Sequence, residues 1–468
     1  MSWTVGQLVQ ATGGRLIAGE PSAPVTGISL DSRTLKAGEA FVAIRGNRFD
    51  AHAFLPQAVA RGAACVIVSN VPPSLPHGAV IAVEDTTQAL GAVAAFHRRR
   101  FHIPVIAVTG SCGKTTTKDF IAHLLNGDRQ VLKTQGTQNN HIGLPMTLLR
   151  LSRDHAAAVV ELGSNHPGEI AYLARIAQPT VAVITNIGPA HLEFFGSLDV
   201  VRQEKLSLVE SLEPGGTAVV PGDQLDVLLG AKTHLPLGRT LLTFGTSEQC
   251  GVCATDVSRH EASFSMRLRG VSGTFEIPLP GSHNVENALA ALTCLKALGI
   301  SLESVQARLA SAQPAPLRSQ LIRTDTLTIL NDCYNANPLS FARALDVLRT
   351  LEVNRKIVIA GDMLELGAFA PAAHQAIGRL CVQAGADRVI AVGEFAEEIG
   401  KGVAQVGSIE VMVFRTVAEL LPHLATLLRP GDGVLVKGSR KLQLEQVTMA
   451  LLEDEATLAS GAAMPSLR

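Results

Sequence analysis

The segment Val105-Ile-Ala-Val-Thr-Gly-Ser-Cys-Gly-Lys-Thr-Thr-Thr-Lys118 joins a short apolar run to a turn rich in glycine and hydroxyl groups. The β-branched residues from Ile103 to Val108 predict a buried parallel strand, and the break at Thr109-Gly110 predicts a turn into a helix. Backbone N–H groups at such a turn bind phosphate oxygens, and the helix dipole favours negative charge there. The segment therefore predicts a phosphate-binding loop.

The residues expected to bind phosphate follow one another without a gap: Gly110, Ser111, Cys112, Gly113, Lys114, Thr115 and Thr116. Lys114 would reach the β/γ-phosphates of a nucleotide, and the Thr115 hydroxyl would ligate Mg²⁺. A regular P-loop has about four residues between its two glycines, whereas only Ser111 and Cys112 separate them here. The alternative is a glycine-rich turn that binds nothing, but the order of strand, glycines, lysine and hydroxyl favours phosphate binding.

Composition narrows the class of protein. The chain has 468 residues, enough for about three domains of roughly 150 residues each. Its formal net charge of −1 argues against nucleic acid as a partner. We see no signal peptide and no apolar run of membrane-spanning length. The seven cysteines are scattered apart from Cys250-Gly-Val-Cys253, which lacks the second pair of a zinc site. Cys112 in a phosphate loop suits a reducing compartment, so we expect a cytoplasmic protein, as a monomer.

We expect an α/β protein of three domains: an α/β N-terminal domain (1–84), a central P-loop-type domain with a mostly parallel sheet and helices (85–315), and a doubly wound, Rossmann-like C-terminal domain (316–468). The last boundary follows Gln313-Pro-Ala-Pro316. The tail from residue 456 onward is expected to fray. Helices are predicted at 5–12, 55–61, 114–125, 168–177, 198–212 and 284–297. Strands are predicted near 16 and at 25–30, 40–44, 65–69, 103–108, 156–161, 181–185, 326–330, 356–360, 388–392 and 433–436, with an antiparallel patch at 252–278.

Polar residues follow the predicted central strands. Because ligands bind outside the carboxyl ends of strands in open α/β sheets, Thr109, Glu161 and Asn186 should share one crevice. Glu161 ends an apolar run and is a natural Mg²⁺ ligand. His191 follows the next strand, where a metal or substrate role is favoured over a structural one. Lys205 lies on a predicted helix, and its alternative is a solvated surface lysine.

Other polar clusters leave two interpretations open. Asn284 and Asn287 lie on one helix face and could pair with adenine or cap the helix. Asp31-Ser-Arg33 and Arg45-Gly-Asn-Arg-Phe-Asp-Ala-His52 could hold a diphosphate and a base, or be ordinary turns. Asn331-Asp-Cys-Tyr-Asn-Ala-Asn-Pro338 and Lys437-Gly-Ser-Arg440 each follow an apolar strand and are dense in donors, as a loop closing over a polyanion would be.

Several of these motifs together resemble the Mur ligase family of peptidoglycan synthesis. The similar segments are 109–116, Asn139-Asn-His-Ile-Gly-Leu-Pro145, Glu161-Leu-Gly-Ser-Asn-His-Pro-Gly-Glu-Ile170, 185–193, 283–287, 331–338 and 435–440. The shortened phosphate loop is the family's own variant. The Asn-His-Pro-Gly-Glu and Asp-Cys-Tyr-Asn-Ala-Asn-Pro motifs point to the member that uses D-alanyl-D-alanine. The Asp-Asn-Pro-Arg motif of the meso-diaminopimelate-adding member is absent.

The resemblance implies an ATP- and Mg²⁺-dependent ligase that forms a carbon–nitrogen bond through an acyl phosphate. Its expected partners are UDP-N-acetylmuramoyl-tripeptide and D-alanyl-D-alanine, giving the pentapeptide, ADP and phosphate for cell wall biogenesis. It implies catalytic roles for Lys114, His191 and Lys205, with Thr115 and Glu161 on one Mg²⁺, and His191 and a carbamate of Lys205 on a second.

The resemblance also implies the contacts to ATP and substrate. For the nucleotide, it adds Asn284, Asn287, Arg318 and Asp332 to the phosphate loop. For the UDP end of the substrate, it implies Ser29, Asp31, Ser32, Arg33, Arg45 and His52. Asn139, Asn140, Asn335 and Ser439 are the remaining substrate contacts expected.

Two rival functions follow from the same residues. The nearer rival is another amide ligase of this architecture, such as a sister Mur ligase or a folylpolyglutamate synthase. The other is a nucleotide-binding regulatory module without ligase activity. The presence of Lys114, Glu161, His191 and Lys205 together argues against that module, which has no need of two metal ligands and a carbamate site.

Overall fold

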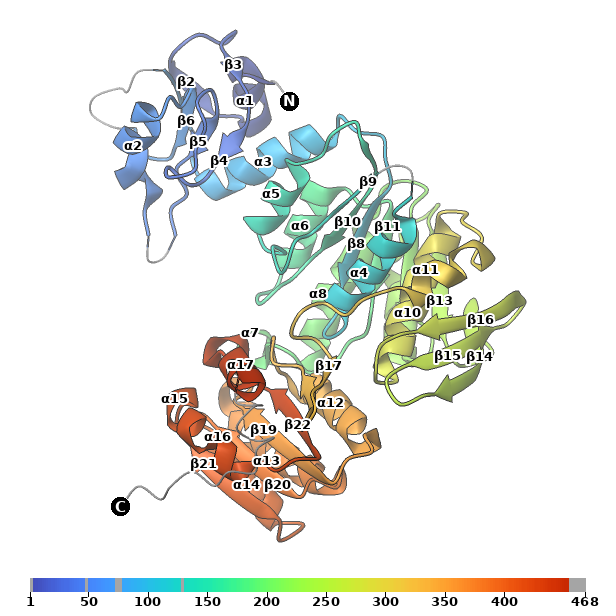
Figure 1. Cartoon of the computed structure of the whole chain (residues 1–468). Helices are drawn as coiled ribbons and strands as arrows, with labels where there is room; N and C mark the ends of the chain where they lie inside the picture. Colours follow the sequence, from blue (N-terminus) through green and yellow to red (C-terminus); the bar gives the residue numbers. More distant parts are fainter. Residues whose placement is uncertain (1–2, 47–48, 72–77, 128–129, 454–468) are drawn as a thin grey trace.

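The computed structural model describes residues 3–46, 49–71, 78–127 and 130–453. The tail expected to fray lies outside these residues, as do Asn47 and Arg48 of the second N-terminal cluster. Three α/β domains follow one another along the chain, as predicted, with the central domain between the other two (Figure 1). None of the helices in the described part of the chain is long and apolar enough to span a bilayer.

The N-terminal domain contains a five-stranded sheet in the order β2-β7-β6-β5-β4, parallel except for β2. The predicted strand at 25–30 is instead split, because β3 pairs with β1 in a separate two-stranded sheet while β4 pairs with β5. The elements here are β1 (Trp3–Thr4), α1 (Val5–Thr12), β2 (Arg15–Ala18), β3 (Pro24–Val25), β4 (Ile28–Ser29), β5 (Ala40–Val42), α2 (Leu55–Ala60), β6 (Cys65–Val68) and β7 (Ala79–Ala82).

Helix α3 (Thr86–Arg98) connects this sheet to the central domain (Figure 1). Its buried residues Leu90, Val93 and Ala94 belong to one core that also contains Val5 and Leu8 of α1. The same core continues into the side chains beneath the central sheet. The N-terminal domain is therefore docked through shared apolar packing, which is the main stabilising contribution in such contacts.

The central domain contains a nine-stranded sheet in the order β16-β15-β14-β13-β12-β11-β8-β10-β9. It is parallel from β9 to β14 and ends in the predicted antiparallel patch. The strands are β8 (Val105–Thr109), β9 (Gln130–Lys133), β10 (His155–Glu161), β11 (Val181–Ile184), β12 (Thr217–Pro221), β13 (Thr240–Gly245), β14 (Val252–Arg259), β15 (Phe264–Leu268) and β16 (Val271–Ile277). The helices are α4 (Lys114–Leu125), α5 (Gly143–Leu148), α6 (Glu169–Ala177), α7 (Leu192–Phe195), α8 (Leu198–Glu210), α9 (Leu225–His234), α10 (His283–Ala297) and α11 (Gln306–Ala310).

Strand β8 is buried on both faces, which explains its continuous apolar sequence. Val105 and Ala107 pack on one side with α3, α5, α6 and α8, while Ile106 and Val108 pack on the other with α4 and α10. Because β8 lies between β10 and β11, the carboxyl ends of the three strands are adjacent. This arrangement brings Thr109, Glu161 and Asn186 to one edge of the sheet.

The C-terminal domain is a doubly wound sheet in the order β17-β18-β22-β19-β20-β21, parallel except for β17. One face is covered by α12, α13 and α14, and the other by α15, α16 and α17. The strands are β17 (Gln320–Arg323), β18 (Thr328–Asn331), β19 (Arg355–Gly361), β20 (Arg388–Val392), β21 (Glu410–Phe414) and β22 (Asp432–Lys437). The helices are α12 (Pro338–Thr350), α13 (Ala370–Gln383), α14 (Ala396–Ala404), α15 (Val417–Leu420), α16 (Leu424–Leu427) and α17 (Glu445–Glu453).

Candidate active site

A cavity of about 770 Å³ is lined by loops of the central and C-terminal domains. It brings together most of the predicted nucleotide and metal residues, although they come from distant parts of the chain. The predicted site residues that line it are Ser111, Cys112, Gly113, Lys114, Thr115, Thr116, Asn139, Asn140, Glu161, His191, Asn287, Arg318, Asp332, Asn335 and Ser439. Gly110, Asn284, Lys205 and the predicted N-terminal residues do not line it.

The phosphate loop is held in place by the segment that follows β11. The Asn186 side chain accepts a hydrogen bond from the Cys112 N–H (3.0 Å) and donates one to the Cys112 carbonyl (3.0 Å). The Ser111 hydroxyl donates to the Gly188 carbonyl at 2.8 Å, and the Thr185 hydroxyl donates to the Cys112 carbonyl at 2.5 Å. These contacts preorganise the loop before any phosphate binds.

Both glycines of the loop have backbone reasons to be glycine. Gly110 has φ 147° and Gly113 has φ 78°, conformations that residues with a Cβ rarely adopt. A Cβ at Gly110 would overlap the Thr185 hydroxyl, and one at Gly113 would overlap the Asn287 side-chain oxygen. Gly113 directly precedes α4, so the loop delivers the N-terminus of that helix to the cavity.

Lys114 points back over the loop, where its ammonium donates to the Gly110 carbonyl at 2.7 Å. Burial lowers the pKa of Lys114, and the Glu161 carboxylate opposes that shift. The nearby Thr115 hydroxyl donates to Glu161 at 2.8 Å, and the Asn139 amide donates to the other carboxylate oxygen at 2.8 Å. The side of the cavity formed by the loop therefore carries a cation and hard oxygen ligands close together.

The residues present fit Mg²⁺, which prefers oxygen ligands and keeps part of its coordination for water and phosphate. Thr115 supplies a hydroxyl from the first turn of α4, and Glu161 supplies a buried carboxylate at the end of β10. Within the described ranges, no group of three or more His, Cys, Asp or Glu side chains is arranged to hold a metal ion.

Lys205 is a buried lysine of α8 and lies directly behind the cavity wall. Its ammonium donates to the Ser164 hydroxyl at 2.7 Å, and Ser164 itself lines the cavity. Burial, reinforced by the Lys114 charge, lowers the pKa of Lys205 to about 7. The alternative of a solvated helix lysine is wrong for this residue, because its relative exposure is only 2%. A free amine is substantially populated here near neutral pH.

His191 lies at the start of α7 with a left-handed backbone (φ 53°). Its Nδ1 is hydrogen-bonded to Oε2 of Glu365, which belongs to the C-terminal domain. That hydrogen bond lowers the pKa of the Glu365 carboxyl group. His191 thus lies where the two domains meet at the cavity.

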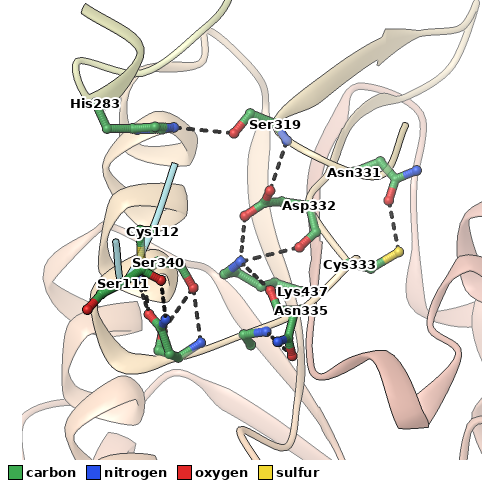
Figure 2. Close-up of polar contacts among 12 residues, drawn as sticks. Ser111, Cys112, His283, Ser319, Asn331, Asp332, Cys333, Asn335, Ser340 and Lys437 are labelled. Carbon is green, nitrogen blue, oxygen red and sulfur yellow. Dashed lines mark hydrogen bonds and ion pairs between the residues drawn. The ribbon is translucent and has the colours of Figure 1, made fainter. Parts of the chain in front are cut away.

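The C-terminal side of the cavity is a network around Asp332 and Lys437. Lys437 donates to the Asp332 carboxylate at 2.5 Å and to the Asn335 carbonyl at 3.1 Å. The other Asp332 oxygen accepts the Ser319 N–H at 2.8 Å. Figure 2 shows these residues side by side, with His283 of the central domain directed at Ser319. These bonds fix Asp332 beside Ser319, in the segment that links the central and C-terminal domains.

Arg318 stacks on Tyr334, with its guanidinium carbon 4.2 Å from the ring centroid. The Tyr334 hydroxyl donates to the Thr137 hydroxyl of the central domain at 2.6 Å. Asn337, at the start of α12, accepts the Cys112 thiol at 3.3 Å (Figure 2 shows the region around Cys112). The C-terminal domain thus contacts the phosphate loop directly.

The two predicted adenine residues behave differently. Asn284 donates to the Pro280 carbonyl at 2.7 Å and accepts the Asn287 amide at 2.9 Å, so both its polar atoms are engaged within the domain. Neither bond caps the helix, because the N-cap residue of α10 is Ser282, whose side chain makes no capping bond. Asn287 lines the cavity and accepts the Thr117 hydroxyl at 3.3 Å.

The predicted UDP residues lie in the N-terminal domain, in two groups at 29–33 and 45–52. Arg33 pairs with Asp31 through two hydrogen bonds of 2.9 and 2.8 Å, which lowers the pKa of Asp31 to about 2. His52 bonds to Asp50 at 2.6 Å and accepts the Ser69 N–H at 3.0 Å. Of the remaining predicted residues, Ser29 donates to the Asp31 carbonyl, Ser32 donates to the Gln57 side chain, and Arg45 is exposed.

The sequence did not predict a role for several residues of the site. Thr185, Asn186 and Asn337 hold the phosphate loop, and Glu365 holds His191. The polar loops at 331–338 and 437–440 gave a signal for the C-terminal side. Glu365 had no comparable signal, because its partner is 174 residues away.

Family models match each domain in turn. Residues 24–98 match the model described as Mur ligase family, catalytic domain. Residues 108–295 match the Mur ligase middle domain, and residues 317–440 match the Mur ligase, glutamate ligase domain. These matches cover most of the residues that line the cavity.

Individual proteins are similar over nearly the whole chain. UDP-N-acetylmuramoyl-tripeptide–D-alanyl-D-alanine ligase of Escherichia coli strain K12 is 36% identical, with 97% of this chain and 99% of the relative covered. A crystal structure of MurF from Acinetobacter baumannii is 37% identical with a TM-score of 0.89, covering 97% of this chain and 99% of that one. MurF ligase from Thermotoga maritima in complex with ADP is 29% identical with a TM-score of 0.82, covering 94% and 99%.

Proposed function

The chain belongs to the Mur ligase family, and from that premise we propose that it is an ATP-dependent ligase joining D-alanyl-D-alanine to UDP-N-acetylmuramoyl-tripeptide. The product is the UDP-linked pentapeptide of peptidoglycan precursor synthesis. A sister Mur ligase or a folylpolyglutamate synthase is not favoured, because the similar full-length relatives are named for the D-alanyl-D-alanine reaction.

The observation that carries the proposal is one cavity shared by two domains. Lys114, Thr115 and Glu161 face it from the central domain, and Arg318 and Asp332 face it from the C-terminal domain. A preorganised phosphate loop opposite a second set of charged groups suits phosphoryl transfer, which depends on positioning and charge neutralisation.

The reaction would proceed in two bond-forming steps. A carboxylate oxygen of the tripeptide attacks the γ-phosphorus of ATP, and the bond to the ADP oxygen breaks, giving an acyl phosphate. The amine nitrogen of D-alanyl-D-alanine then attacks the acyl carbon and loses a proton. The tetrahedral intermediate collapses by breaking the bond to the phosphate oxygen, which releases inorganic phosphate.

The chain's own groups support these steps from fixed positions. The Lys114 ammonium and the N–H groups at the start of α4 would stabilise negative charge on the transferred phosphoryl group. Arg318 and Asp332 would hold the nucleotide from the C-terminal side, with Asn287 on the central side. Bound Mg²⁺ would supply further charge neutralisation and would be held by Thr115 and Glu161, and by His191 with a carbamate of Lys205.

Lys205 is a suitable carbamate precursor because its amine is buried and its pKa is lowered to about 7. The neutral amine attacks the carbon of CO₂ and loses a proton, which converts a cation into an anion with two oxygen acceptors. An unmodified ammonium at this position would repel a divalent cation. Ser164, which accepts its hydrogen bond, would then lie beside the carbamate.

The UDP end of the substrate would lie in the N-terminal domain, with Asp31, Arg33, Arg45 and His52 among its contacts. Asn139, Asn140, Asn335 and Ser439 would contact the peptide end, because they line the cavity. We further propose that the enzyme works in the cytoplasm, since all seven cysteines are free, as a reducing compartment requires.

Measurement of coupled ADP release tests this function. Release should require ATP, Mg²⁺, UDP-N-acetylmuramoyl-tripeptide and D-alanyl-D-alanine together, and mass spectrometry should identify the pentapeptide. Folate with glutamate, or the dipeptide substrate of a sister Mur ligase with its amino acid, should give no product. Product formation from either of those pairs, with none from the tripeptide and D-alanyl-D-alanine, would overturn the proposal.

A further inference from the structure

Two loops from different domains meet at His191, and both carry strained backbone. His191 has φ 53° and Glu365 has φ 62°, although neither is a glycine. Such conformations cost about 1 kcal/mol or more each and persist only where the surroundings enforce them. The strain is therefore located at the point where the central and C-terminal domains touch beside the cavity.

The two loops are joined at more than one point. His191 Nδ1 is hydrogen-bonded to Glu365 Oε2, and the Glu193 N–H donates to the Glu365 carbonyl at 3.1 Å. A Cβ at Gly367 would lie 3.2 Å from the Glu193 Cα, which is tighter than ordinary contact. This combination of a side-chain bond and a backbone bond fixes how Glu365 approaches the imidazole.

The loop that carries Glu365 is anchored within the C-terminal domain. The Leu364 N–H donates to the Ser439 hydroxyl at 2.9 Å, and the Ser439 N–H donates to the Asp362 carbonyl at 2.9 Å. The Asp362 carboxylate in turn accepts the N–H groups of Glu394 (2.8 Å) and Phe395 (2.9 Å). Glu365 must therefore move with the C-terminal domain.

We propose that Glu365 is a positioning residue that orients His191 when the two domains are together. By accepting the Nδ1–H, it fixes the imidazole tautomer and leaves Nε2 as the acceptor that a metal ion requires. Hydrogen bonds of this kind to a metal-binding histidine change metal affinity or activity by about 10–100-fold. The proposal rests on the proposed function, in which His191 holds the second Mg²⁺, and it makes that site dependent on domain closure.

The test is metal binding measured apart from turnover. Mn²⁺ is titrated into the full-length protein with a non-hydrolysable ATP analogue and UDP-N-acetylmuramoyl-tripeptide, and free Mn²⁺ is followed by electron paramagnetic resonance. Glu365→Ala should weaken Mn²⁺ binding at the second site about 10-fold or more, while Glu365→Gln, whose amide oxygen still accepts the Nδ1–H, should recover most of the affinity. Glu394→Ala is the matched control, because it removes an exposed carboxylate of the same domain that does not line the cavity and leaves the backbone bond to Asp362.

The outcomes separate the two proposals. His191→Ala should weaken the same site, and adding Glu365→Ala to it should have little further effect. If His191→Ala leaves Mn²⁺ binding unchanged, the metal role of His191 in the proposed function is wrong. If His191→Ala weakens binding but Glu365→Ala does not, or if Glu394→Ala has the same effect as Glu365→Ala, the positioning role alone is overturned. Thermal melting curves identify any variant that fails to fold.

Discussion

The two sides of the cavity are held together in different ways. On the central side, the phosphate loop is bonded to Thr185, Asn186 and Gly188 of its own domain, and these contacts are buried. On the C-terminal side, Tyr334, Asn337 and Glu365 each reach the central domain across the interface. One side is complete within a single domain, whereas the other is complete only when two domains meet.

This difference suggests that the central side stabilises charge during the reaction, whereas the C-terminal side controls when the site is assembled. A loop bonded within its own domain binds phosphate without reorganisation, as electrostatic stabilisation requires. Groups delivered by a second domain are in place only after closure, which allows substrates to enter and products to leave. We therefore expect substitutions on the central side to remove chemistry, and substitutions on the C-terminal side to change how often the site is assembled.

The largest effect is expected from Lys114→Ala. Removal of the ammonium leaves the charge of the transferred phosphoryl group uncompensated, so ADP release should fall roughly 10³-fold or more. The fold should be unaffected, because among the described residues the Lys114 side chain has a single hydrogen-bond partner, the Gly110 carbonyl. Coupled ADP release and a melting curve measure the two quantities. Near-normal release from a variant with a normal melting temperature would refute the assignment.

Lys205→Ala comes next. If Lys205 is carbamylated, the variant loses a metal-binding anion, and activity should fall on the order of 100-fold. A short carboxylic acid such as acetate should partly restore activity by occupying the vacated space beside Ser164. Lys232→Ala, which removes another helix lysine from the same domain, serves as the control. Full activity of Lys205→Ala without any added acid would exclude the carbamate.

The sequence predicted the central side of the cavity better than the C-terminal side, for a physical reason. The phosphate loop, Glu161 and Asn186 each follow an apolar strand, and parallel strands bring their carboxyl ends together. The pattern along the chain was therefore enough to place them at one edge. The bounds predicted for α4 also agree with the structure, because Gly113 and Asn126 flank an uninterrupted helix.

Contacts that depend on how domains dock were beyond the sequence. His191 and Glu365 are 174 residues apart in the chain, and no pattern in either loop predicts that the two residues pair. The prediction of one strand at 25–30 was wrong for a related reason. Here β3 pairs with β1 and β4 pairs with β5, in two different sheets. The sequence also did not predict that the Asn284 side chain bonds to the Pro280 carbonyl and to the Asn287 side chain.

A moderate effect is expected on the C-terminal side from Tyr334→Phe. The change removes only the hydroxyl that donates to Thr137, a bond that contributes about 0.5–1.5 kcal/mol. The closed arrangement should be less populated, so kcat/KM should fall by about tenfold at most. Small-angle scattering should show less compaction than in the unmodified protein when an ATP analogue and UDP-tripeptide are added. Arg318 still stacks on the phenyl ring, which separates this variant from loss of a nucleotide contact. Unchanged compaction and kinetics would show that the bond does not favour closure.

The smallest effect concerns stability, at His283 between the two sides. Burial lowers the pKa of His283 from 6.5 to about 4. The nearby Arg343 and Lys437 cations add to this shift, and the Asp332 carboxylate opposes it. Because the unfolded chain binds the proton at higher pH than the folded one, the free energy of unfolding falls as pH drops from about 6.5 to about 4. The loss should be on the order of 1–2 kcal/mol, less than the full shift implies, because the side chain is partly exposed.

His283→Gln removes this titration, so the melting temperature of the variant should decline less steeply as pH drops from about 6.5 to about 4. The buried His97 and His374 also have lowered pKa values and remain in both proteins, so only the difference between the two curves reports on His283. Parallel curves would mean that His283 takes up its proton at the same pH in the folded and unfolded states.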